Sequence, residues 1–244
     1  MIAAQIARKA VRSGARALNL HECTSAALMN KYGVPTARGV VAETVDEVEQ
    51  ATRQLRDEAG AEDVVVKSQI LAGGRGKGTF TTGFQGGVHI AHSPEEARML
   101  GEKMLNKVLV TKQTGPEGKT VSKLFITERL YVRRESYFAI LLDRASGGPV
   151  MIGSAAGGMD IEAVAEQFPD KIRKEFIDID NGPTQEQVEA LAKTMGFVGK
   201  GQLEQCSDLI KNLYKLFREC DATQIEINPL GETSDKRVLA LDAK

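Results

Sequence analysis

The sequence predicts a fold of the α/β or α+β class, because strand and helix signals alternate along the whole chain of 244 residues. The run VVVK at residues 64–67 is typical of a buried strand. The runs SYFAILLD and VMIGSA, joined by RASGGP, predict an antiparallel hairpin. Apolar residues recur at helical spacing over residues 203–220. A chain of this length can bury a core as one large domain or as two small ones.

The predicted helices carry recognisable start and stop signals. The first covers residues 22–32 and ends at Gly33, with Pro35 just beyond it. Three further helices open on capping residues, namely Thr44 with Glu47, Ser93 with Pro94 and Glu96, and Thr184 with Gln187. The helix after Thr44 also has an apolar row, made of Val45, Val48, Ala51 and Leu55.

The longest predicted helix carries an apolar row that includes two of the three cysteines. Its members are Leu203, Cys206, Leu209, Leu213, Leu216 and Cys220. We therefore interpret Cys206 and Cys220 as core residues rather than redox groups. The odd number of cysteines and the lack of a C-x-x-C spacing favour reduced thiols over a disulfide framework.

The composition is that of an ordinary globular protein, with 42% hydrophobic and 27% charged residues. A formal net charge of -1 argues against electrostatic capture of nucleic acid or of an acidic membrane. Aromatic residues make up 5% and Trp is absent, which argues against a base-stacking surface. The three histidines lack ligand spacing, and no apolar run approaches membrane-spanning length. We expect neither nucleic acid nor a membrane as a partner.

Residues 1–18 differ from the rest of the chain, because they carry Arg8, Lys9, Arg12 and Arg16 but no acidic residue. An Arg-rich, acid-free N-terminus that can form an amphipathic helix predicts a mitochondrial transit segment. The expected location is then the mitochondrial matrix. A basic N-terminal helix without a targeting role is the alternative interpretation.

The stretch KSQILAGGRGKG at residues 67–78 is a candidate phosphate-binding loop, although it matches neither common phosphate fingerprint. Lys77 is followed by glycine where a Walker A loop needs Ser or Thr, and Thr79 stands where the dinucleotide pattern needs its third glycine. Glycines let backbone N–H groups converge on an anion, and Arg75 adds positive charge. Because strand and turn follow the loop, we expect a glycine flap over a nucleotide, with Lys67 below it. A hairpin tip with solvated charges is the alternative.

The runs ATQIEINPL and RVLALDAK form a second candidate site near the end of the chain. In the first run, polar residues alternate with isoleucines that would face the core, and the polar ones are Gln224, Glu226 and Asn228. The intervening PLGETSDK can turn the chain back, which places Asn228 opposite Asp242 across an antiparallel pair. Oxygen ligands of this kind suit Mg²⁺. The polar outer face of an ordinary hairpin is the alternative.

The stretch FITERLYVRRESYF holds Glu128 and Glu135 around a basic cluster of Arg129, Arg133 and Arg134. Strand residues that lead into a short irregular link would present backbone groups to a purine edge. Exposed Glu–Arg pairs on a connecting loop are the alternative explanation.

Taken together, these stretches resemble the β-subunit family of succinyl-CoA synthetase (succinate–CoA ligase), whose members contain an ATP-grasp domain. The resemblance runs from NLHE at residue 19 to the last residue, through KSQILAGGRGKG, KQTG, GGMDIEAVAE, DATQIEINPL and LDAK in that order. It implies an α+β ATP-grasp fold, with two lobes and the nucleotide site between them. Lobe A would cover about residues 19–40 and 125–244, and lobe B about residues 41–124. Family members continue into a C-terminal CoA-ligase domain, so we expect either a fragment or a natural short form.

The resemblance also implies roles for individual residues. The nucleotide would be held by Lys67 beneath the phosphates, by Gly74, Arg75, Gly76 and Lys77 over them, by Glu128 and Leu130 at the purine edge, by Glu135 towards the ribose, and by His21. Asn228 and Asp242 match the ligands of one Mg²⁺ per subunit. Glu226 and Arg75 are the catalytic candidates, and Glu226 matches a glutamate placed where a phosphorylated histidine visits the nucleotide. His21 is the residue type of ADP-forming relatives, whereas GTP-type animal subunits tend to have Gln there, so ATP and ADP are the expected nucleotides.

The family's reaction converts succinyl-CoA, phosphate and a nucleoside diphosphate into succinate, CoA and the triphosphate, as a step of the tricarboxylic acid cycle. Its phosphohistidine belongs to the α subunit, which is the expected partner in a heterodimer or heterotetramer. Two other functions stay open. One is a nucleotide-binding module without turnover, and the other is a related ATP-grasp acyl-CoA ligase that acts on malate or citrate.

Overall fold

The computed structural model describes residues 19–158 and 161–243, which divide into two compact units. Unit 1 takes in residues 26–36 and the described chain from residue 131 onward, and unit 2 takes in residues 19–25 and 37–130. The transit segment expected at residues 1–18 lies outside the described residues.

The division differs from the expected lobes at residues 19–25, which cluster with unit 2, and at residues 37–40 and 125–130, which cluster with unit 2 as well. The last two stretches belong to one sheet. The reason is that β7 (Leu124–Glu128) forms antiparallel ladders with both β1 (Gly39–Ala42) and β2 (Val64–Ser68). Backbone hydrogen bonds in these ladders therefore hold both stretches within one sheet. The unit boundary falls in the short link after β7.

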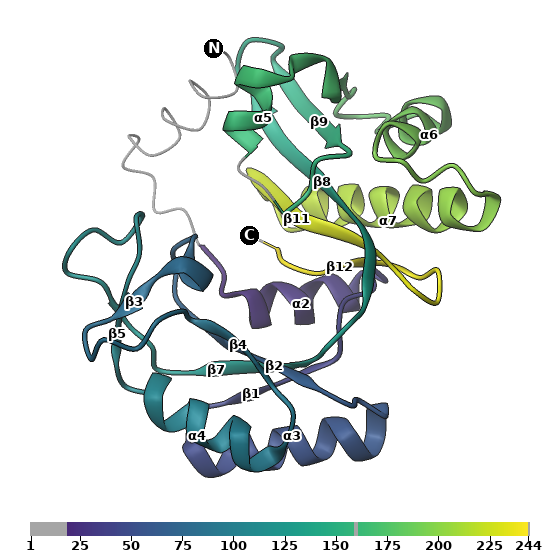
Figure 1. Cartoon of the computed structure of the whole chain (residues 1–244). Helices are drawn as coiled ribbons and strands as arrows, with labels where there is room; N and C mark the ends of the chain where they lie inside the picture. Colours follow the sequence, from purple (N-terminus) through teal and green to yellow (C-terminus); the bar gives the residue numbers. More distant parts are fainter. Residues whose placement is uncertain (1–18, 159–160, 244) are drawn as a thin grey trace. The chain divides into compact units, whose positions relative to one another are not determined.

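Unit 2 is built on an antiparallel four-stranded sheet in the order β1-β7-β2-β4, where β4 is Val88–Ala91. Helices α3 (Val45–Ala59) and α4 (Pro94–Met104) lie side by side on one face of this sheet (Figure 1). The Thr44–Glu47 capping box and the Ser93 cap are both present, as predicted. The core between sheet and helices includes Val48, Leu55, Val64, Val66, Met104, Leu124 and Ile126.

A smaller sheet in unit 2 follows the glycine loop. It has the order β3-β5-β6, with β3 at Thr79–Phe80, β5 at Val108–Val110 and β6 at Lys119–Thr120. Strand and turn follow the loop, as predicted. The loop itself contains a single turn of 3₁₀-helix, η1 (Arg75–Lys77), which the sequence pattern does not reveal. Such short turns leave little periodicity to detect.

Unit 1 is built on an antiparallel five-stranded sheet in the order β10-β9-β8-β11-β12. Its strands are β8 (Val132–Asp143), β9 (Gly148–Ser154), β10 (Ile172–Phe176), β11 (Gln224–Thr233) and β12 (Val238–Ala240). The predicted hairpin is therefore confirmed as β8 and β9. Strand β11 extends through most of PLGETSDK, so the turn before β12 is shorter than the sequence suggests.

Helices cover both faces of the unit 1 sheet (Figure 1). On one side α6 (Gln185–Thr194), α7 (Lys200–Glu219) and the later residues of α2 (Glu22–Lys31) bury the main core, which contains Met29, Phe138, Leu191, Leu209 and Leu213. On the other side, Ile161 of α5 (Ile161–Gln167) packs against Tyr137, Ala139, Val150 and Ile152. A 3₁₀ turn, η2 (Pro169–Lys171), links α5 to β10. The capping box of Thr184 and Gln187 opens α6, as predicted.

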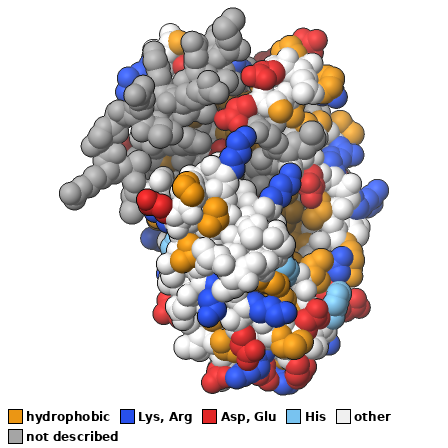
Figure 2. Space-filling model, turned by 60° about the vertical axis from the view of Figure 1, so that its left-hand side comes forward, with side chains coloured by type: hydrophobic (Ala, Val, Ile, Leu, Met, Phe, Trp, Pro, Cys, Tyr) orange, Lys and Arg blue, Asp and Glu red, His pale blue; other side chains and the backbone are white. Residues whose placement is uncertain are grey.

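The surface shows no dominant charge in the view of Figure 2, where Lys and Arg side chains are interspersed with Asp and Glu. Within residues 19–158 and 161–243, no helix has both the length and the apolar composition that a membrane crossing requires.

The three thiols differ in their burial, and one of the two core assignments is wrong. Cys206 is buried in the main core of unit 1, as predicted. Cys220, however, is exposed, because it caps the C-terminus of α7 one residue past the last helical turn. The helical row therefore ends at Leu216, and Cys23 is the other buried thiol.

We expect a charged, membrane-impermeant thiol reagent to label Cys220 and to leave Cys206 unmodified in the native protein. Burial raises the pKa of the Cys206 thiol, which removes thiolate as well as access. Peptide mass mapping after brief labelling measures both sites, and denatured protein gives the full-labelling reference. Rapid native labelling of Cys206 would contradict the buried assignment.

Candidate functional site

Strand alternation places Lys67 on the face of the β2 sheet opposite to the helices of unit 2. Val64 and Val66 point into the helix-covered core, and Lys67 therefore points away from it. Its neighbours across the ladders are Val88 of β4 and Phe125 of β7, so the lysine lies in the interior of the sheet rather than at an edge. Its side chain is only 14% exposed. A lysine that is buried to this extent is normally paired with an opposite charge.

The partner of Lys67 is Glu22, the first residue of α2. The Lys67 ammonium donates to one Glu22 carboxylate oxygen at 2.8 Å, and the Arg75 guanidinium donates to the other. The side chain of Glu22 is 5% exposed and that of Arg75 is 13% exposed. One buried carboxylate thus bridges the strand lysine and the loop arginine, and the three charges sum to one positive charge.

The ionised state of Glu22 is favoured by its partners. Burial acts to raise the pKa of this carboxyl, but the charges and hydrogen bonds of Lys67 and Arg75 outweigh burial, so its pKa lies below the ordinary value. A depressed folded-state pKa contributes stability above the ordinary carboxyl pKa, and this contribution is lost as the pH falls through the folded-state value. The bridge is therefore intact at neutral pH.

The glycine loop is folded back onto the end of β2. Arg75 donates from its guanidinium to the Ser68 carbonyl at 3.0 Å, and its own carbonyl accepts from Gly87 N–H at 2.8 Å. Gly74 is left-handed, with φ 73° and ψ 13°, and the right-handed η1 turn follows at once. A left-handed residue followed by a right-handed one turns successive N–H groups towards one point, as in anion-binding nests. Lys77, on η1, is exposed.

His21 lies in a positively charged environment. Burial is the largest influence that lowers the pKa of its imidazole, and the charges of Lys123 and Arg75 lower that pKa further. His21 is therefore neutral at neutral pH. Lys67, Arg75 and Lys123 thus give unit 2 a concentration of positively charged side chains at the end of β2 where the glycine loop begins.

Backbone groups at the other nucleotide candidates in unit 2 are partly engaged. Glu128 is buried, and its carboxylate accepts from Arg38 N–H at 2.8 Å. The Glu128 N–H donates to the Arg38 carbonyl at 2.9 Å, and the Arg129 N–H donates to the Asp63 carbonyl at 3.0 Å. Glu128 thus holds the end of β7 in place through both its backbone and its carboxylate.

The second candidate site lies in unit 1, where the predicted antiparallel pairing of its two runs is confirmed. Asn228 N–H donates to the Asp242 carbonyl at 2.9 Å, so the two residues face each other across the β11–β12 hairpin. Ile225 and Ile227 are buried and Glu226 is half-buried on the opposite face, as predicted. The Asn228 side-chain oxygen accepts from Gly158 N–H at 2.8 Å, which orients the amide.

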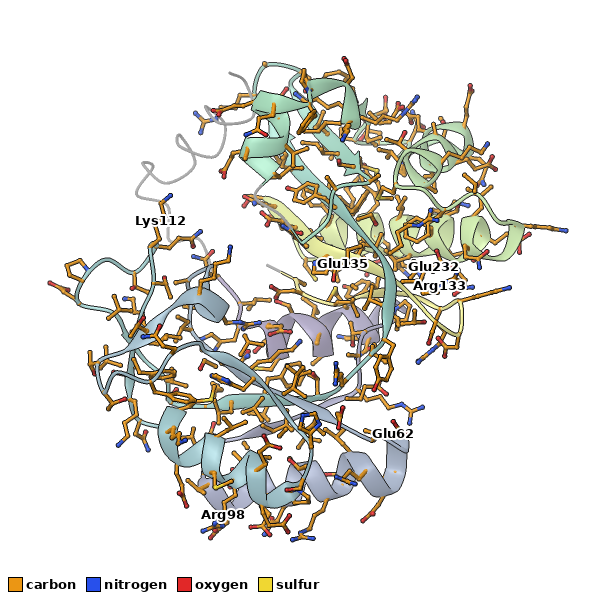
Figure 3. All side chains as sticks on the ribbon, viewed as in Figure 1. Glu62, Arg98, Lys112, Arg133, Glu135 and Glu232 are labelled. Atoms are coloured by element: carbon orange, nitrogen blue, oxygen red, sulfur yellow. The ribbon has the colours of Figure 1, made fainter. Side chains whose placement is uncertain are left out.

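Gly158 also explains how Glu135 fits into this site. A Cβ at Gly158 would collide with the Glu135 carboxylate, and the residue has φ +68°. Its neighbour Gly157 donates to the Glu135 carbonyl at 3.3 Å. The GG pair thus lets β8 and β11 bring Glu135 and Asn228 to the same short backbone segment. Figure 3 shows Glu135 on β8.

Asn228 and Asp242 suit a hard cation better than a softer one. Within the described ranges, no three His, Cys, Asp or Glu side chains gather as a metal-holding group. Mg²⁺ does not require such a group, because it keeps several waters and takes one or two carboxylates together with substrate phosphates. An amide oxygen can accept from an N–H and contact a cation at the same time, since it has two lone pairs. The donor set therefore fits Mg²⁺.

Two structural residues of these sites escaped the sequence reasoning. Glu22 stands beside His21 in the NLHE stretch, and Gly158 belongs to GGMD, so both occur in stretches that carry the family resemblance. The signal for Glu22 was an acid at the start of a helix, which is also what an ordinary helix N-terminus favours. Only its contacts with residues 45 and 53 positions away identify it as part of the site.

A family model for the ATP-grasp domain matches residues 19–232 of the chain. Among curated proteins, the mitochondrial β subunit of the ADP-forming succinate–CoA ligase of Neurospora crassa is 50% identical over 94% of this chain and 50% of its own length. The GDP-forming β subunit of Sus scrofa is 47% identical over 94% of this chain and 52% of its own length. The chain thus spans about half the length of the curated relatives it matches.

Solved structures show the same fold at much lower identity. The dinucleotide-forming acetyl-coenzyme A synthetase 1 of Ca. Korarchaeum cryptofilum, in complex with coenzyme A and Mg-AMPPCP, matches with a TM-score of 0.61 and 18% identity over 98% of this chain and 96% of that one. The ATP citrate lyase of Methanothrix soehngenii matches with a TM-score of 0.62 and 17% identity over 92% of this chain and 49% of that one.

Proposed function

The chain belongs to the ATP-grasp domain family, and from this premise we propose that it forms the nucleotide-binding part of the β subunit of a succinate–CoA ligase. The observation that carries the proposal is the convergence of Lys67, from a strand, and Arg75, from the glycine loop, on one buried carboxylate. Two cations and one anion leave a net positive charge where a phosphate chain would lie. Relatives at 47–50% identity bear this name.

The proposed reaction step moves a phosphoryl group between the nucleotide and a histidine of the α subunit. Such transfer depends mainly on positioning and on stabilising charge on the phosphoryl oxygens. In this role Lys67 contacts the phosphates, and the N–H groups from Gly74 to Gly76 cover them. Arg75 and Glu226 are the proposed catalytic residues, and Glu226 stands on the polar face of β11 where the incoming histidine would be received.

The metal proposal assigns one Mg²⁺ to Asn228 and Asp242. Bound there, Mg²⁺ supplies charge neutralisation and geometry for the phosphate oxygens. The Gly158 N–H orients the Asn228 oxygen, and the β11–β12 hairpin supplies the carboxylate opposite to it. Glu135 on β8 is proposed to contact the ribose, and the link at Leu130 to contact the purine edge.

Three finer proposals follow from the relatives. The partner is the α subunit, in a heterodimer or heterotetramer, and the location is the mitochondrial matrix, because the relatives are named mitochondrial. ADP is the proposed nucleotide because of His21, although both ADP-forming and GDP-forming relatives match. A neutral His21 can serve either as donor or as acceptor towards the nucleotide.

A related acyl-CoA ligase is the second candidate, since an ATP citrate lyase shares the fold. Both candidates would bind their nucleotide in the same ATP-grasp domain, so the acid substrate distinguishes them.

The test uses the complete β subunit together with its α partner. We expect ATP with Mg²⁺ to phosphorylate the α subunit, and succinate with CoA to discharge the phosphohistidine. Radiolabel transfer from the γ-phosphate measures the first half, and malate and citrate are matched alternatives in the second. Discharge by citrate or malate but not by succinate would reject the succinate assignment, and absence of α labelling would reject the nucleotide step.

A further inference from the structure

We propose that Glu22 is a positioning residue of the phosphate site, whose carboxylate holds Lys67 and Arg75 together and keeps the glycine loop folded onto the end of β2. The inference rests on the proposed function and deepens it. Glu22 itself would not touch the reacting phosphate. It would act through the two cations that do.

The first step of the argument is electrostatic. Lys67 and Arg75 are both largely buried, with 14% and 13% of their side chains exposed. Two cations held at such short range in a poorly solvated place repel each other strongly. A carboxylate that accepts from both of them offsets this repulsion, and the remaining positive charge still favours an anion. Without Glu22, the two cations would move apart. Arg75 would be the one that moves, because it lies on the glycine loop whereas Lys67 lies on a strand.

The second step concerns the loop. Arg75 connects the glycine loop to the end of β2, to the following turn and to the segment before β4. Its guanidinium donates to Ser68, and its carbonyl accepts from Gly78 N–H at 3.1 Å and from Gly87 N–H at 2.8 Å. Glycines on both sides supply no side-chain packing of their own. The Glu22–Arg75 ion pair therefore contributes directly to the folded position of the loop.

The third step shows that Glu22 stays in place when an anion arrives. Its neighbour Cys23 donates its N–H to the Gln69 side-chain oxygen at 3.0 Å, and Gln69 in turn donates to the carbonyls of Lys67 and Ser68 at 3.3 Å. The start of α2 is thus tied to the end of β2 by a buried glutamine. Lysine has three N–H donors, and the Glu22 carboxylate occupies one of those on Lys67. A phosphate can therefore bind Lys67 without displacing Glu22.

The experiment compares Glu22→Gln with a matched control in the full chain. Glu49 is the control, because its carboxylate also lies between two cations of unit 2, at 2.8 Å from Arg53 and 3.3 Å from Arg98. These residues belong to α3 and α4, on the helix-covered side of the sheet, where Figure 3 labels Arg98. Mg-ADP affinity by calorimetry is the first readout. Cleavage by trypsin after Arg75, followed by mass spectrometry, is the second.

We expect Glu22→Gln to weaken Mg-ADP binding about tenfold and to speed cleavage after Arg75, whereas Glu49→Gln changes neither. Glu22→Asp keeps the charge but is too short to span both cations, so it should fall between wild type and Glu22→Gln. If Glu22→Gln does not fold, the same two measurements are made on Glu22→Asp. Unchanged affinity in a folded Glu22 variant overturns the proposal, and tighter binding overturns it by showing that Glu22 competes with the phosphate. Failure of the wild type to bind Mg-ADP would instead refute the proposed function.

Discussion

Replacing Lys67 by methionine is expected to weaken the binding of Mg-ADP about 100-fold, which corresponds to about 2.7 kcal/mol. The side chains have similar length, so the change removes charge more than volume. Lys67, Arg75 and Glu22 together carry one positive charge, and without Lys67 the remaining pair is neutral. A phosphate chain would then lose the net positive charge of this three-residue cluster and would keep only the attraction of the loop N–H groups and of more distant cations. Calorimetric titration of the full chain with Mg-ADP measures the loss.

The control for this change is Lys103→Met on α4. The Lys103 Nζ atom lies 5.3 Å from the centre of the Phe84 ring, and Lys103 belongs to α4 of unit 2, on the face of the sheet opposite to the one that Lys67 faces. Its replacement removes the same charge from the same unit, and we expect affinity to stay within about twofold of wild type. Thermal unfolding of both variants separates loss of binding from loss of folding. A folded Lys67→Met variant with wild-type affinity would remove Lys67 from the site.

The helices and strands could be predicted from the sequence because their signals are local. Thr44 with Glu47 and Thr184 with Gln187 lie within one helical turn, and each pair forms the capping box that its spacing predicts. The Asn228–Asp242 pairing was also accessible, since it follows from strand alternation and one hairpin. Cys220 shows the limit of such patterns, because a row at helical spacing does not reveal where the helix ends.

The candidate site could be predicted only in part, because its decisive contacts are non-local. Lys67 and Arg75 were identified from the loop pattern, but the carboxylate that joins them comes from α2, at residue 22. A glutamate at a helix start has an ordinary explanation in the helix dipole. Nothing in the order of residues distinguishes that explanation from an ion pair made across the fold. Gly158 is similar, since its close approach to Glu135 is a property of the folded sheet.

Replacing Asp242 by alanine is expected to abolish the Mg²⁺-dependent phosphorylation of the α subunit by the complete αβ complex, with a loss of at least about 100-fold at ordinary Mg²⁺ concentration. The proposed ion has two ligands from this chain, Asn228 and Asp242, and Asp242 is the only charged one. Because Gly158 N–H donates to the Asn228 side-chain oxygen, we expect the hairpin to keep this second oxygen ligand in place. Radiolabel transfer from ATP to the α subunit, measured over a range of Mg²⁺ concentrations, gives the size of the loss.

The matched control is Asp235→Ala, which removes a carboxylate from the turn of the same hairpin. Asp235 is exposed and accepts from the Arg237 guanidinium at 2.7 Å, so its loss should leave phosphoryl transfer unchanged. Partial recovery of Asp242→Ala at high Mg²⁺ would indicate weakened ion binding, as the metal role requires. Wild-type phosphorylation by Asp242→Ala at every Mg²⁺ concentration would show that the β11–β12 hairpin holds no ion needed for transfer. The pairing of Asn228 and Asp242 would then be the polar face of an ordinary hairpin, and the phosphate charge would have to be neutralised by Lys67 and the glycine loop alone.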